Sequence, residues 1–117
     1  MLTRDAILKI KDIKTEELFV PEWGDTVLVR GLTGNQRDRY EASIVEMRGK
    51  TQVLRMEQMR ARLCALCLVD ANGRPLFDFE EAEELGKKNA AALERICQVA
   101  QRLSGLTDGD VEALAKN

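Results

Sequence analysis

The feature that most constrains the fold is a wide apolar stripe in residues 90–103, which predicts a helix buried on more than one side. Its apolar positions recur at helical spacing, at Leu93, Ile96, Cys97, Val99, Ala100 and Leu103. Gly105 stands where a glycine commonly ends a helix. Other elements must surround this helix, and because the 117 residues include only one Trp, one Tyr and three Phe, the core must be aliphatic.

The N-terminal part of the chain predicts a short helix and then a β-hairpin. Thr3 is placed to cap the helix. Apolar and β-branched runs at 18–20 and 26–29 flank Pro21 and Gly24, which are typical turn residues. We therefore expect a hairpin over roughly residues 16–30.

The remaining residues predict about four or five helices. Thr33 and Gln36 have the spacing of a capping box, which predicts a helix from Gly34 to about Gly49. A longer helix would carry Met56, Met59, Leu63, Leu66 and Cys67 on one face. Asp78 with Glu81 repeats the capping signature, and Thr107 would cap a last short helix.

These elements define the expected fold class, which is α+β, mostly α, with an N-terminal β-hairpin followed by a bundle of helices. We expect one domain over residues 1–117. Its core should draw on every major element, with Leu28, Leu32, Tyr40, Ile44, Leu63, Cys67, Leu93, Ile96 and Ala100.

The titratable residues do not suggest an enzyme. The chain has no histidine, which excludes the Ser-His-Asp and Cys-His catalytic arrangements. Cys64 and Cys67 form a CxxC pair, but a zinc site needs a second pair and only Cys97 remains. We therefore predict no catalytic residue, no metal and no cofactor, and we expect the cysteines to be reduced core residues.

The hydropathy pattern indicates neither a membrane span nor a signal peptide. The longest apolar run, Leu63 to Val69, has seven residues, whereas a membrane helix needs roughly 20. Charged residues interrupt the first twenty positions. We expect a cytoplasmic protein with no membrane association.

Positive charge is concentrated in residues 30–62, which contain eight basic and four acidic residues, although the whole chain has a net charge of -2. Gly31 and Gly34 also have the spacing of the GXXG loop that clamps nucleic acid in KH domains. The loop contains no Lys or Arg, however, and a capped strand-to-helix turn explains both glycines. Nucleic acid is therefore not the favoured partner, and a small nucleic-acid-binding regulator using the basic 30–62 segment is the alternative function.

Met47, Met56 and Met59 have two open interpretations. Methionine adapts to irregular apolar surfaces, so these side chains could line a partner-binding groove. They could equally belong to the core. So short a chain has more apolar stripes than one small core obviously needs, so the partner-binding interpretation stays open.

A set of short segments runs in a fixed order through nearly the whole chain. It opens with residues 20–24 and 27–34 and the charged residues 37–41. It continues through 62–63, 69–70, Gly73, 76–77, 85–86 with Lys88, 91–93 and 99–107. As an ordered set these segments resemble the tail assembly chaperones of long-tailed, siphovirus-type phages and prophages.

The resemblance implies a non-catalytic assembly factor that works in the host cytoplasm and is absent from the mature virion. Such a protein coats the tape measure protein and brings tail tube subunits to it, often through an extended form made by ribosomal frameshifting. Self-association is expected as well, because covering a long helical partner takes many copies. The candidate contacts are Trp23, as an exposed aromatic anchor at the hairpin tip, and Met47, Met56 and Met59.

Overall fold

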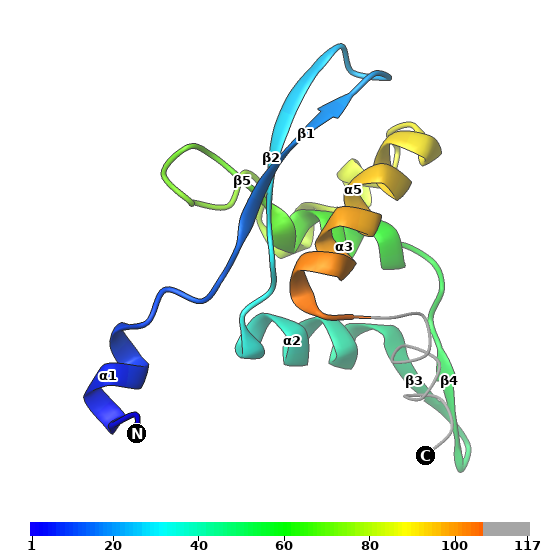
Figure 1. Cartoon of the computed structure of the whole chain (residues 1–117). Coiled ribbons are helices and arrows are strands. Elements are labelled where there is room, and N and C mark those ends of the chain that lie inside the picture. The colour runs from blue at the N-terminus through cyan, green and yellow to red at the C-terminus, as the bar shows by residue number, and fades with distance from the viewer. Residues whose placement is uncertain (107–117) are drawn as a thin grey trace.

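The computed structural model describes residues 1–106, which contain helices and two small antiparallel sheets (Figure 1). In chain order the elements are α1 (Arg4–Lys9), β1 (Thr15–Val20), β2 (Asp25–Arg30), α2 (Gly34–Ile44), β3 (Val45–Arg48), β4 (Thr51–Leu54), α3 (Met59–Cys67), β5 (Leu68–Val69), the 3₁₀ helix η1 (Phe79–Glu81), α4 (Ala82–Leu85) and α5 (Ala90–Ser104). The expected mixture of helix and strand is confirmed. The last helix expected after Thr107 lies outside the described residues.

The first sheet is built on the expected hairpin, with strand order β1-β2-β5. Leu18 pairs with Val27, and the N–H groups of Trp23 and Gly24 donate to the Val20 carbonyl over 3.0 and 2.9 Å to close the turn. Gly24 has φ +72°, a conformation that glycine adopts at little cost. The two-residue strand β5 pairs with β2 and was not predicted.

The core lies between the inner face of this sheet and the helices. Helices α3 and α5 pack on each other, and α5 lies against β1 and β2 (Figure 1). Every residue from Leu63 to Val69 is buried, as are Ile96 and Ala100. The wide stripe of α5 is therefore covered on two sides, by α3 and by the sheet, as its breadth predicts.

One expected core residue is placed differently. Leu28 is only half-buried, and its neighbour Val29 is fully buried instead. Adjacent strand residues point to opposite faces, and both are apolar, so the face that α5 covers decides which one enters the core. The other eight expected core residues are buried, namely Leu32, Tyr40, Ile44, Leu63, Cys67, Leu93, Ile96 and Ala100.

The helix expected to run from Gly34 to Gly49 is too long. Helix α2 ends at Ile44, and the chain continues directly into a second hairpin in which Arg48 pairs with Thr51 around Gly49. Gly49 has φ +64°, as a tight turn requires, and β-branched residues at 45, 51 and 53 favour strand. The strands β3 and β4 therefore replace part of the expected helix bundle.

The next helix is shorter than expected, because it begins only at Met59, after Gln58 in a left-handed conformation with φ 61°. The capping predictions are confirmed: Thr33 and Gln36 form a reciprocal capping box, and so do Asp78 and Glu81. None of the helices described here is long and apolar enough to span a membrane.

Candidate partner-binding surface

A groove of about 190 Å³ lies where the start of α3 meets the connection between α4 and α5. We call it the methionine groove. It is lined by Met56, Gln58, Met59, Arg60, Ala61, Gly86, Lys88, Ala90 and Leu93. Met56 is 61% exposed, whereas Met59 is half-buried and packs on the core. The core interpretation therefore applies in part to Met59, whereas Met56 is exposed to solvent, as the partner-binding interpretation requires.

Trp23 does not stand free at the hairpin tip. It is half-buried and packs on the core, and it lines a second hollow of about 260 Å³ with Phe77, Leu85 and Lys88. Trp23 was expected to be an exposed aromatic anchor, and this expectation is wrong because the side chain is half-buried. Trp23 is covered because the hairpin leans over the start of α5, as Figure 1 shows.

An ion pair fixes the hairpin tip in this position. The Nε of Arg95 donates to Oε1 of Glu22 over 3.0 Å, and its Nη2 donates to Oε2 over 3.2 Å. These hydrogen bonds lower the pKa of Glu22 below its ordinary value. A bidentate pair of this kind fixes orientation as well as distance, so the tip is tied to α5 and Trp23 is held beside Leu85 of α4.

The structure brings three of the four candidate contacts into one neighbourhood. Lys88 lines both the methionine groove and the hollow at Trp23, so Met56, Met59 and Trp23 flank the same connection. Met47 lies elsewhere, on β3 opposite Gln52, and is 57% exposed. Phe77, Leu85 and Lys88 were not predicted as contacts, and their only sequence signal was that they belong to the ordered family segments.

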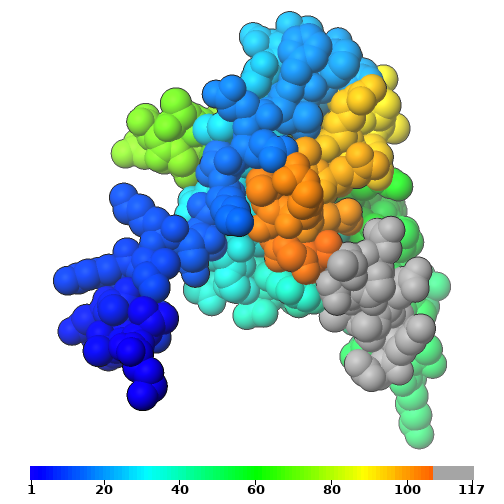
Figure 2. Space-filling view, in the orientation of Figure 1, coloured from blue at the N-terminus to red at the C-terminus, as the bar shows by residue number. Residues whose placement is uncertain are grey.

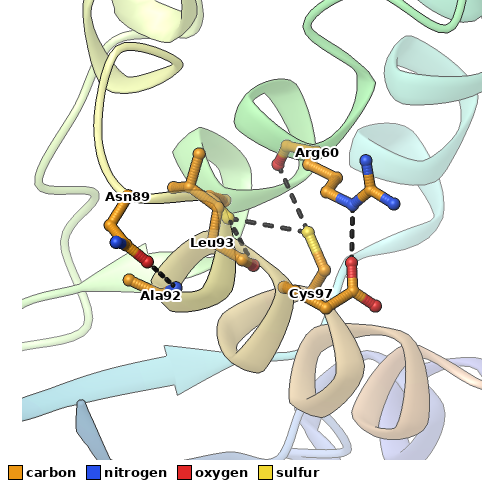
Figure 3. Close-up of polar contacts among 7 residues, drawn as sticks. Arg60, Asn89, Ala92, Leu93 and Cys97 are labelled. Atoms are coloured by element: carbon orange, nitrogen blue, oxygen red, sulfur yellow. Dashed lines mark hydrogen bonds and ion pairs between the residues drawn. The ribbon is translucent and has the colours of Figure 1, made fainter. Parts of the chain in front are cut away.

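The cysteines form part of the core. Cys64 lies close to Cys97, with 3.7 Å between their sulfur atoms, and the Cys97 thiol donates to the Arg60 carbonyl (Figure 3). The contact with Cys97, together with burial, raises the pKa of Cys64, and burial raises the pKa of Cys67 to about 12. All three thiols are free, and no group of potential metal ligands occurs within residues 1–106. The spacing of the CxxC pair did not indicate that Cys64 would contact Cys97.

The arginines of residues 30–62 are mostly engaged with the protein itself. Four of them form ion pairs, which are Arg37 with Glu41, Arg39 with Glu80, Arg48 with Glu46 and Arg60 with Glu94. The side chains of Arg30 and Arg62 donate to the carbonyls of Gly73 and Ser43. The four ion pairs partly neutralise the positive charge, and the arginines are spread over several elements, which does not favour phosphate binding.

Apolar side chains with a few charges at the rim are typical of a protein-interaction surface. The comparisons with known proteins identify the class more closely. The chain matches the model of the phage tail assembly chaperone family over residues 2–117, and it therefore belongs to that family.

One solved structure has the same fold, with a TM-score of 0.65 at 22% sequence identity, and is described as the bacteriophage HK97 tail assembly chaperone. The match covers 90% of this chain and 94% of that chain. No curated protein matches.

Proposed function

We propose that the protein is a non-catalytic assembly factor that binds the tape measure protein and promotes polymerisation of the tail tube. The observation that carries the proposal is the family match over residues 2–117. The methionine groove and the adjoining hollow at Trp23 supply a surface suited to the task.

The methionine groove fits an amphipathic helix of the partner. Such a helix lays its apolar face into a groove and keeps its polar face in water. Met56 offers an exposed and adaptable side chain to that face. Lys88 has no ion pair within the described part of the chain, so an acidic residue beside the partner's apolar face would find a counter-charge there.

The wider role follows the same logic. The protein acts in the host cytoplasm, associates with further copies along the tape measure protein and is absent from the mature virion. Contact with the tail tube protein is made through a frameshifted extended form that carries an additional domain.

A matched pair of variants tests the binding surface. Met56→Asp should reduce co-purification with the cognate tape measure protein by roughly tenfold or more, because it places a charge in the apolar contact. Met47→Asp makes the same change at a similarly exposed methionine on another element and should leave binding near the wild-type level. Trp23 is the less suitable probe, because it also packs on the core.

Equal retention by the two variants would show that the contact lies outside the methionine groove. If the wild-type chain does not bind the tape measure protein but binds DNA at low salt only, the function is instead that of a nucleic-acid-binding regulator.

A further inference from the structure

Within residues 1–106, the largest concentration of exposed apolar side chains lies in the first fourteen residues, which we call the N-terminal arm. Its exposed members are Met1, Leu2, Ile7, Leu8 and Ile10, and α1 has no buried residue. The arm stands away from the body in Figures 1 and 2. A six-residue helix is too short to be stable alone in water, and a cluster of exposed apolar side chains marks an interaction site.

The path of the chain directs the arm away from its own body. The Gly31 N–H donates to the Lys14 carbonyl over 2.9 Å, which extends the pairing of β1 and β2 to Lys14. The arm therefore leaves in line with β1. No glycine or proline occurs before Pro21, so the segment lacks the residues that favour a sharp reversal. This geometry favours docking of the arm on another molecule.

The outer face of the first sheet is an apolar surface that could receive such an arm. Phe19 and Leu76 are 58% and 50% exposed, and Leu28 is half-buried beside them. A groove of about 320 Å³ on this face, which we call the outer groove, is lined by Glu17, Thr26, Val27, Leu28, Val69, Ala71 and Leu76. The solvent face of an antiparallel sheet is normally polar, so this one lacks a cover.

Charge selects the outer groove over the methionine groove. The arm carries four basic and two acidic residues, a net charge of +2, and Lys9 and Lys11 form no ion pair with any described residue. The charged residue lining the outer groove is Glu17, which is also unpaired in residues 1–106, whereas neighbouring Glu16 binds Arg102. The methionine groove has no acidic lining residue and carries Lys88, which has no ion pair in residues 1–106, so it would repel a basic arm.

We propose that the N-terminal arm of one copy docks into the outer groove of a second copy, with α1 on Leu28 and Leu76, and with Lys9 and Lys11 of the arm near Glu17. The inference rests on the self-association included in the proposed function and assigns the surfaces that produce it. Arm and groove are different surfaces, so the contact is heterologous and each copy can both give and receive an arm.

Complementary variants test the contact by sedimentation velocity or light scattering over about a hundredfold range of concentration. Ile7→Asp with Leu8→Asp disables the arm, and Leu76→Asp or Glu17→Lys disables the groove. Each variant alone should be monomeric where the wild type assembles. An equimolar mixture of an arm variant and a groove variant should form a dimer, because one intact arm meets one intact groove. Met47→Asp should assemble like the wild type.

Two results would overturn the inference. If the arm variant assembles like the wild type, or if the mixture stays monomeric while the wild type assembles, the contact lies elsewhere and self-association stands. If the wild type is monomeric at every concentration, both the inference and the self-association in the proposed function are wrong. Binding of the tape measure protein to the arm variant then tests the remaining part of the proposed function.

Discussion

Gly31 lies where the loop after the first hairpin touches the end of α5. A Cβ on Gly31 would approach the Leu103 carbonyl oxygen to 2.8 Å, and the adjacent Leu32 N–H donates to the Ser104 hydroxyl over 2.8 Å. Gly34 has no such neighbour within 4 Å. The two glycines of the apparent GXXG motif therefore have different roles, and only Gly31 is required by a close backbone approach.

Substitution at these glycines should separate their roles. Gly31→Ala should lower the free energy of unfolding by roughly 1–3 kcal/mol, because backbone must move to admit the methyl group. Gly34→Ala should change it by no more than about 0.5 kcal/mol. Urea unfolding measures both, and equal stability of the two variants would contradict this account of Gly31.

Residue burial could be predicted wherever a periodic pattern was long. The stripe of α5 identified Leu93, Ile96 and Ala100 correctly, because a fifteen-residue helix repeats its pattern several times. In β2, by contrast, Leu28 and Val29 are both apolar, and nothing local says which one faces α5. The half-burial of Trp23 could not be predicted from the local sequence either, because it depends on residues more than fifty positions away, such as Phe77.

At the scale of elements, capping signals were more reliable than apolar spacing. The capping boxes at Thr33 and Asp78 mark the starts of α2 and η1, because they depend on residues three positions apart. The spacing of Tyr40, Ile44 and Met47 matched a helix as well, yet Met47 lies on β3. The β-branched residues around Gly49 were the better signal, and the second hairpin was missed because a short apolar run fits either element.

The hairpin tip should respond to acid through Glu22. Its lowered pKa means that the ion pair with Arg95 is complete above the ordinary glutamate pKa of about 4.3 and is lost as the pH falls through the lowered value. The chain has one tryptophan, so the emission of Trp23 reports on the tip. We expect the emission to move to longer wavelength only in that acid range.

A matched pair of carboxamide variants controls for general acid effects. Glu22→Gln should already show longer-wavelength emission at neutral pH, because the pair with Arg95 is lost. Glu83→Gln changes an exposed carboxylate on α4 and should titrate like the wild type. An unchanged emission in Glu22→Gln would show that the ion pair does not hold the tip.

At the scale of the whole molecule, the two proposed surfaces are separate. The N-terminal arm leaves at the lower left of Figure 1, and the connection from β4 to α3, which carries Met56, lies at the right. A copy can therefore hold a neighbour through the arm and still present the methionine groove to another partner. The proposed role, in which many copies cover a long helical partner, requires such a separation.

The most direct test of the central claim is the salt dependence of binding to the cognate tape measure protein, measured by titration calorimetry. Apolar contacts depend little on salt, so between about 50 mM and about 200 mM salt the dissociation constant should change by no more than a few-fold. Phosphate contacts made by several basic residues would weaken by roughly a thousandfold over the same range. A complex with the tape measure protein that persists at the higher salt supports the account. No detectable binding to the tape measure protein, together with salt-sensitive binding to DNA, would contradict it.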